Sequence, residues 1–182
     1  MIVNKLNIKI LAIMLASQIT ISCNESTDNQ SQNSSLGTTV TRATDPTVGL
    51  SSEQISANVG DEFTLDITLS NFPISEGGGV TIQYDPNVLN VSNVIINSDV
   101  WNFVNKVGSI DNNNGIISDI LFSSFEGVSG DNSVATITFT AIGTGQSNIS
   151  MTDSSINPFS SEGNKISVNF VNTNVQINTA SN

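Results

Sequence analysis

The segment VTIQYDPNVL, from Val80 to Leu89, decides the fold class of this chain. In its first half, apolar residues alternate with Thr81 and Gln83, which is the period of a half-buried β-strand. The Asp-Pro-Asn that follows is a turn sequence, and Leu89 starts the next apolar run. The segment therefore predicts a strand, a tight turn and the start of a second strand.

The same period of two recurs along the chain from Val48 onward. Strands are predicted at residues 63–69, 80–84, 89–96, 116–125, 134–142, 147–151 and 166–177. A slip in phase after Leu89 predicts a bulge, and the run DNNNG from Asp111 to Gly115 predicts a hairpin turn. No helical period is present beyond the N-terminal segment. The pattern predicts an all-β fold, an antiparallel β-sandwich of jelly-roll type with about nine strands.

The residues expected in the core occupy every second position of these strands, because alternate side chains of a strand point to opposite faces. The predicted core residues are Phe63, Leu65, Ile67, Val80, Ile82, Leu89, Ile137 and Phe139.

Charge and composition exclude several functions. The 182 residues include 16 Asp+Glu, 5 Lys+Arg, no His and one Cys, for a net charge of -11. Nucleic acid is not an expected partner, because phosphate binding needs clustered Lys and Arg. Without His and with a single Cys there is no Ser-His-Asp or Cys-His pair, no His/Cys zinc site and no internal disulfide. We expect no cofactor, and the chain is not expected to be an enzyme.

The N-terminal segment is typical of a secretory signal. Lys5 and Lys9 precede a short apolar run that is well below the roughly 20 residues needed to cross a bilayer. Thr20-Ile21-Ser22-Cys23 follows and resembles a bacterial lipobox, which implies cleavage after residue 22 and a lipid on Cys23. We expect a lipid-anchored protein of the bacterial cell envelope that contacts the membrane only through that lipid. The alternative is a plain secreted protein that does not use the lipobox.

A polar tether is predicted over residues 23–47, between the signal peptide at 1–22 and a domain at 48–182. Ser, Thr, Asn and Gln dominate the tether, and it lacks aromatic residues. Such a composition cannot bury enough apolar surface to offset the entropy of ordering it. Cleavage would remove Lys5 and Lys9 and leave 3 basic against 16 acidic residues, a net charge of -13.

The order of motifs resembles a cohesin domain over residues 48–177. The matching segments are residues 58–65 (NVGDEFTL), 71–73 (NFP), 80–89 (VTIQYDPNVL), 115–117 (GII), 134–141 (VATITFTA) and 143–145 (GTG). The resemblance implies a nine-stranded jelly roll that binds dockerin modules of polysaccharide-degrading enzymes through one flat sheet face and performs no chemistry. The expected partner is thus a secreted, dockerin-like protein.

The resemblance also points to one face of the sheet. Family members use an Asn and an Asp just before the strand that ends in YDP, whereas this chain has Glu76 followed by glycines at 77–79. By strand period, the candidates for a partner-binding face are Thr81, Gln83, Ser118 and Ser123. The alternative is that these four are solvated strand residues without a partner.

Other functions remain open at this stage. A carbohydrate-binding module on the same sandwich could stack Trp101 or Phe103 on a sugar and bind polysaccharide directly. A calcium loop beginning at Asp111 is less favoured than a hairpin turn, because Gly115 and Phe122 do not match the EF-hand positions. A glycosidase, using carboxylate pairs such as Asp61 and Glu62 or Asp66 and Glu76, is a distant third.

The lipid anchor gives the first prediction. Replacing Cys23 by Ser removes the thiol that would carry the lipid, so we expect Cys23→Ser to leave the membrane fraction as an uncleaved or soluble form. Membrane fractionation followed by immunoblotting measures this. Wild-type protein found wholly in the culture medium would contradict the anchor.

Overall fold

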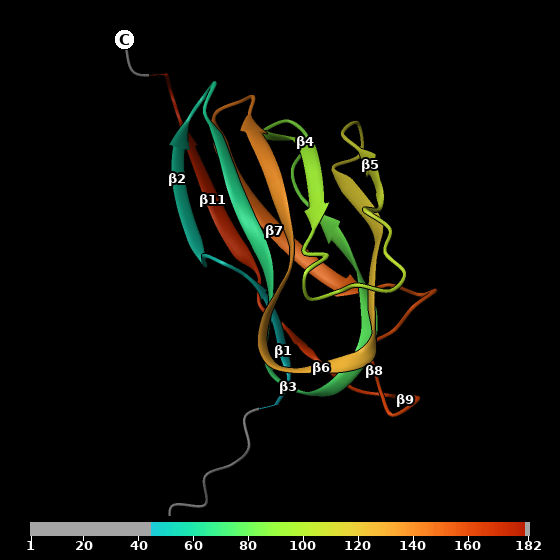
Figure 1. Cartoon of the computed structure of the whole chain (residues 1–182). Coiled ribbons are helices and arrows are strands. Elements are labelled where there is room, and N and C mark those ends of the chain that lie inside the picture. Colours follow the sequence, from blue (N-terminus) through green and yellow to red (C-terminus); the bar gives the residue numbers. More distant parts are fainter. Residues whose placement is uncertain (1–44, 181–182) are drawn as a thin grey trace, which may run out of the picture. The chain divides into compact units, whose positions relative to one another are not determined.

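The computed structural model describes residues 45–180, and the predicted signal peptide and the tether up to residue 44 lie outside the described residues (Figure 1). The described residues form eleven strands and no helix, so they contain no helix that could span a membrane. The strands are β1 (Thr47–Leu50), β2 (Gln54–Asn58), β3 (Glu62–Gln83), β4 (Leu89–Ile96), β5 (Ser109–Asp111), β6 (Ile116–Ala141), β7 (Gly145–Asp153), β8 (Ser160–Ser161), β9 (Asn164–Lys165), β10 (Asn169–Phe170) and β11 (Thr173–Asn178).

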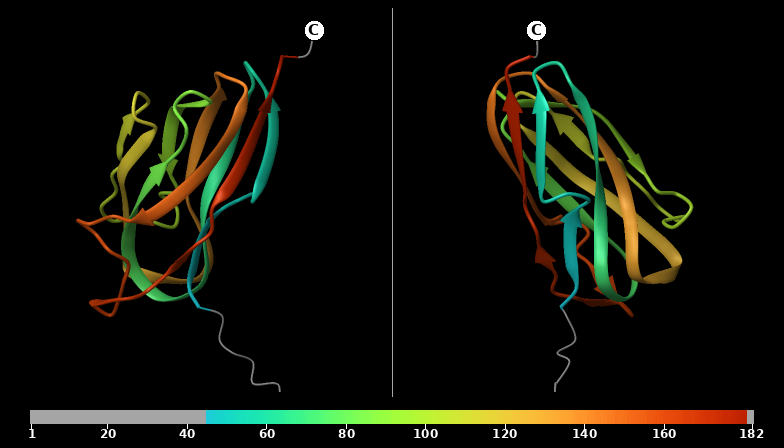
Figure 2. Two further views of the ribbon diagram at one scale, coloured as in Figure 1. Left: turned by 180° about the vertical axis from the view of Figure 1, so that it is seen from behind. Right: turned by 90° about the vertical axis from the view of Figure 1, so that its left-hand side faces the viewer.

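Two long strands, β3 and β6, organise the sandwich. They pair antiparallel from Glu62↔Thr140 to Gln83↔Ile116 and bend together at several register shifts. The bend is visible near the bottom of Figure 1, and Figure 2 shows it from two further sides. Each strand therefore contributes one half to each of two layers. One layer has the order β4–β6–β3–β1–β10, and the other has the order β5–β6–β3–β7–β11–β2.

The predicted jelly-roll sandwich is confirmed, with three corrections. Two pairings, β1–β10 and β11–β2, are parallel, so the sheet is mixed rather than purely antiparallel. The strands predicted at 63–69 and 80–84 are halves of one strand, as are those at 116–125 and 134–142. The single strand predicted at 166–177 is wrong. There the chain leaves β10, which pairs with β1, and enters β11, which pairs with β7 and β2. Alternation of apolar residues continues through that crossing and does not reveal it.

The core contains the residues that strand parity predicts. Seven of the eight are buried, and Phe63 is half-buried with its ring stacked on Phe139 at 5.6 Å. Trp101, in the loop that joins β4 to β5, is fully buried, and its indole N–H donates to the Ser133 carbonyl of β6 at 3.2 Å. Its ring meets Phe122 edge-on at 4.7 Å. The buried indole plugs the core, so Trp101 is not a sugar-stacking residue.

Two polar turns are tied together at one end of the sandwich. The hydroxyl of Tyr84 donates to Asn112 Oδ1 at 2.6 Å, and the same oxygen accepts the Val91 N–H at 2.7 Å. The Asn114 amide and nearby backbone N–H groups hold the pKa of Asp111 below its usual value. Burial, and then the charge of Asp111, raise the pKa of Tyr84. Asp111 thus closes a hairpin turn, and the bulge predicted after Leu89 is confirmed between Val91 and Asn93.

Strand parity gives a prediction for stability. Ile137 is completely buried, so we expect Ile137→Ala to lower the free energy of unfolding by about 2–5 kcal/mol, as for other core truncations. Ile95 is 59% exposed on β4, so the matched change Ile95→Ala should cost less than about 0.5 kcal/mol. Urea unfolding of both variants measures the difference. Equal losses would show that the faces are wrongly assigned.

Candidate functional site

The outward face of β3, β6 and β7 is open and polar. On β3 and β7, Thr81 lies opposite Thr152, and Gln83 lies opposite Ser150. The residues between them, Ile82 and Met151, point inward and are buried. The outward side chains therefore form a continuous polar patch, which we call the polar face.

The four residues predicted for this face lie on β3 and β6, but they differ in what they offer. Gln83 is exposed, and Thr81 and Ser118 are half-buried beside it. The Thr81 hydroxyl accepts the backbone N–H of Asp119 at 3.3 Å. Ser123 lies further along β6, where its hydroxyl accepts the Val104 N–H at 2.9 Å and donates to the Val104 carbonyl at 2.7 Å. The Ser123 hydroxyl thus fastens a loop, and Gln83 is the freest polar group of the four.

Close packing explains the glycine run at 77–79. A Cβ on Gly77 would collide with the Phe122 carbonyl oxygen of β6, and Gly77 has a φ of 153°. A Cβ on Gly78 would lie 2.5 Å from the buried ring of Phe159, and one on Gly79 would lie 2.6 Å from the side chain of Leu121. The space left by the missing side chains is filled by this chain's own residues, so it is not available for the closer approach of a partner.

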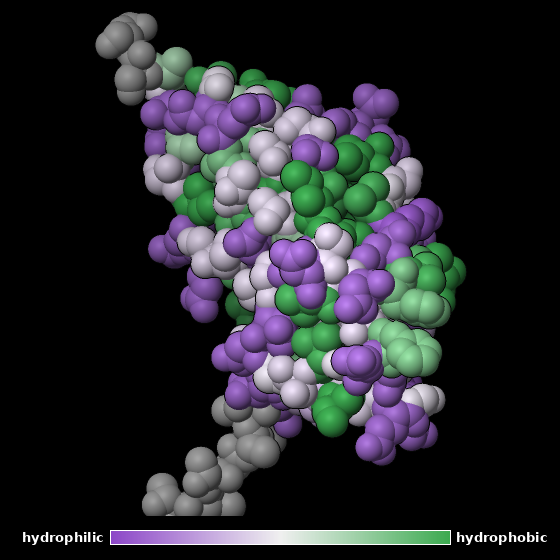
Figure 3. All heavy atoms as spheres, in the orientation of Figure 1, coloured by the Kyte–Doolittle hydropathy of each residue, from purple (hydrophilic) through white to green (hydrophobic). Residues whose placement is uncertain are grey.

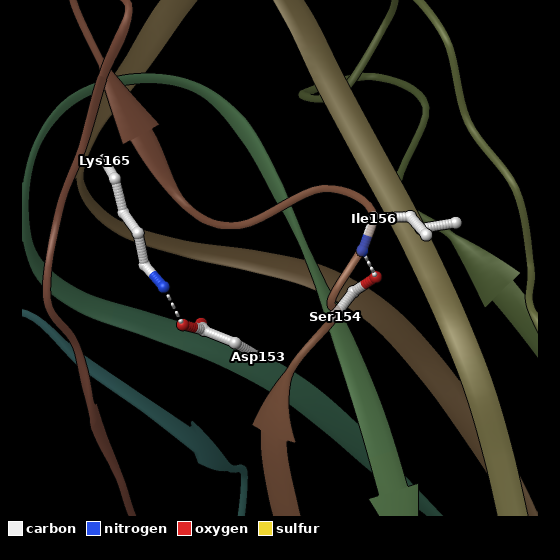
Figure 4. Close-up of polar contacts among 4 residues, drawn as sticks. All are labelled: Asp153, Ser154, Ile156 and Lys165. Carbon is white, nitrogen blue, oxygen red and sulfur yellow. Dashed lines mark hydrogen bonds and ion pairs between the residues drawn. The ribbon is translucent and has the colours of Figure 1, made fainter.

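The segment after β7 covers this glycine run. The Ser154 N–H donates to the Gly79 carbonyl at 2.8 Å, and the Asn157 amide donates to the Gly78 carbonyl at 2.9 Å. Ser154 also fixes the segment at its start, because its hydroxyl donates to Asp119 Oδ1 at 2.7 Å. The same hydroxyl accepts the Ile156 N–H at 3.3 Å (Figure 4). An ion pair of Lys165 and Asp153 at 3.3 Å lies beside it.

An apolar groove lies at the end of the polar face, next to the glycine run. Three separate segments build it: Phe103 and Val104 from the β4–β5 loop, Leu121 and Phe125 from β6, and Ile156 from the β7–β8 loop. We call these five residues the apolar groove, whose volume is about 530 Å³. In the space-filling view, apolar atoms reach the surface at the right-hand edge, below β5 (Figure 3).

One fixed carboxylate borders the apolar groove. Glu76 accepts the Glu162 N–H at 2.7 Å and the Ser160 hydroxyl at 3.4 Å. Partial desolvation opposes the charged form, but these and neighbouring backbone hydrogen bonds outweigh it and hold the pKa of Glu76 below its usual value. Glu76 is therefore ionised at neutral pH and held in one place.

Comparison with known proteins assigns the chain to a family. A model of the cohesin domain family matches residues 48–177. The chain belongs to the cohesin family. No curated protein matches this cohesin in sequence.

Solved cohesin structures share its fold. A non-cellulosomal cohesin from Archaeoglobus fulgidus is 18% identical, with a TM-score of 0.57 over 74% of this chain and 92% of the other. The Coh-OlpC–Doc435 complex from Clostridium thermocellum, a type I cohesin–dockerin complex, is 17% identical, with a TM-score of 0.61 over 75% and 95%. The third cohesin of ScaC from Acetivibrio cellulolyticus, in complex with the ScaB dockerin, is 20% identical, with a TM-score of 0.58 over 74% and 99%.

The carboxylates considered for catalysis take part in local hydrogen bonds of this cohesin. Asp61 accepts the Asn58 N–H at 2.8 Å within a turn, and Asp66 accepts the Thr136 hydroxyl at 2.5 Å across two strands. Within residues 45–180, no group of three or more Asp, Glu, His or Cys side chains is placed to hold a metal ion.

Reasoning from sequence missed the apolar groove. The sequence points to Phe103 only as a sugar-stacking residue, and it does not single out Leu121 or Ile156. One signal was available: Phe122 points into the core, so Phe125 has the opposite parity and an apolar residue there faces outward.

The glycine run gives a second prediction for stability. Gly77→Ala forces a side chain into a backbone conformation used almost only by glycine, so we expect a loss of about 1–3 kcal/mol in the free energy of unfolding. Gly49 on β1 is the control, because a Cβ there would find only ordinary contacts, the nearest at 3.7 Å. Thermal or urea unfolding measures both. A Gly77→Ala variant as stable as Gly49→Ala would refute the steric role.

Proposed function

We propose that this cohesin is a non-catalytic binding module that docks a secreted, dockerin-bearing protein on the polar face of β3, β6 and β7. Membership of the cohesin family over residues 48–177 is the observation that carries the proposal. The polar face supports it, because Gln83, Thr152 and their neighbours form an open patch on hydrogen-bonded strands. Rigid, flat sheet faces suit docking, because little ordering is needed on binding.

The place of action follows from the N-terminal sequence. In this proposal Cys23 carries a lipid, the polar tether spaces the domain from the membrane, and the cohesin presents its face outside the cell. A partner linked to polysaccharide binding or degradation would then be held at the cell surface.

A second candidate is direct binding of a glycan. An amide-lined groove of about 440 Å³ crosses β2, β11 and β7, and its polar residues include Gln54, Gln146, Asn174 and Gln176. Amide groups can both donate to and accept from sugar hydroxyls. The groove contains no aromatic ring on which a sugar could stack, and this makes the protein partner the first choice.

Affinity capture tests the proposed partner. With the full chain as bait in the organism's own secretome, we expect a protein with a dockerin-like module. The double variant Gln83→Lys with Thr152→Lys should lose that protein, because two lysines would disrupt the polar face. The control Thr64→Lys with Ser92→Lys adds the same charge to exposed positions of the other layer and should bind normally.

Two results would count against the proposal. Equal capture by both double variants would show that the partner uses another surface. Glycans without any protein would favour the second candidate, and loss of glycan binding in Gln146→Ala with Gln176→Ala would then locate it. Unchanged unfolding midpoints in all variants ensure that the effects concern binding.

A further inference from the structure

The exposed apolar residues of this cohesin are unevenly distributed. Four large side chains are more than half exposed within one groove: Phe125 at 80%, Phe103 at 64%, Ile156 at 63% and Val104 at 62%. Single exposed apolar residues are ordinary on a protein surface, but a gathered patch indicates an interaction site. This patch lies at the end of the polar face.

The shape of the apolar groove favours a side chain over a sugar. The rings of Phe103 and Phe125 lie 5.9 Å apart, and their planes make an angle of 56°. At this separation the two rings contact each other, so they form one tilted aromatic wall and not a broad flat platform for a sugar ring. A compact apolar side chain can pack against this wall and the aliphatic residues beside it. A volume of about 530 Å³ also falls within the usual size of binding pockets, roughly 300–1,000 Å³.

The negative charge of this cohesin indicates which kind of residue the partner carries next to that apolar side chain. Glu76 is the one charged residue among those that line the apolar groove. Residues 45–180 carry 14 Asp and Glu against two lysines, Lys106 and Lys165, a net charge of -12. Such a surface attracts cationic partners and repels acidic ones.

We propose that the apolar groove contributes most of the binding free energy when a partner docks on the polar face. In this docking the groove binds an apolar side chain that is flanked by Lys or Arg on the partner protein. The inference rests on the proposed function, since it names the chemistry of the partner at that same surface. The apolar side chain packs against the paired rings of Phe103 and Phe125 and contacts Leu121 and Ile156. The cationic residue pairs with Glu76.

The distribution of energy over an interface supports this arrangement. A standard interface buries about 800 Å² on each partner, but a few well-packed residues contribute most of the affinity. The hydroxyl and amide groups around Gln83 exchange hydrogen bonds with water for hydrogen bonds with the partner, and the net gain is small. The apolar groove removes exposed apolar surface from water and is the stronger contact.

A defined probe tests the inference without knowledge of the natural partner. A phage library of random dodecapeptides is selected on the full chain, and the selected peptides are synthesised. We expect them to share an apolar residue next to Lys or Arg, and their affinity to fall as the salt concentration rises. Phe125→Ser should weaken them by about tenfold or more, and Glu76→Gln by about two- to fivefold.

Matched variants serve as controls. Ile95→Ser removes an exposed apolar side chain from β4, and Glu53→Gln removes a charge beside β2, so neither should change peptide affinity. Ile156→Ser is a second groove variant, from a separate loop, and should weaken binding as Phe125→Ser does. Unfolding midpoints show that each variant is folded.

The outcomes separate this inference from the proposed function. Selected peptides that lack the apolar–basic pair, peptides that bind Phe125→Ser as well as wild type, or a selection that enriches nothing would each overturn the groove assignment. If the captured dockerin-bearing protein binds Phe125→Ser normally, the groove assignment fails and the proposed function stands. If peptides bind the groove but no dockerin-bearing protein is captured, the proposed function fails and the groove assignment stands.

Discussion

The pairing of β3 with β6 through their common bend is the constraint on which the rest of this cohesin depends. The two strands remain partners from Glu62 to Gln83 while they pass from one layer to the other, so a single ladder fixes the distance between the layers. At the bend Gly77 lies against the Phe122 carbonyl of β6, which leaves no room for a side chain. Phe122 in turn packs on Trp101 and Phe159, and the bend is thereby joined to the core.

The site is a consequence of the same constraint. Because β3 and β6 enter the second layer together, their outward residues lie side by side with those of β7 and form the polar face. The loops on either side then fold over the end of that face: Ser123 fastens the β4–β5 loop, and Asp119 fastens the segment after β7. Phe103 and Ile156 are brought to Leu121 by these hydrogen bonds, so the apolar groove is a product of local polar contacts.

Much of the fold follows from the sequence, because its signals are local. Alternation placed Leu65, Ile137 and Phe139 in the core, and the asparagine-rich run placed the β5–β6 turn. The crossing between β10 and β11 was missed, since a strand that changes partners keeps the same alternation. The apolar groove was missed for a related reason. Its residues come from three segments that meet only through tertiary contacts, and only the parity of Phe125 marked one of them.

The glycine run shows how a departure from the family pattern can have a structural cause. Just before the strand that ends in YDP, this chain has Glu76 followed by glycines at 77–79, and a side chain at 77 or 79 would strike Phe122 or Leu121. Polar groups therefore cannot be restored there without moving β6 or the segment after β7. The absence of a side chain at position 79 and the presence of Leu121 over Gly79 are two aspects of one packing arrangement. In the proposed docking, recognition at the bend would therefore rest on shape and apolar contact, and recognition around Gln83 would rest on polar contacts.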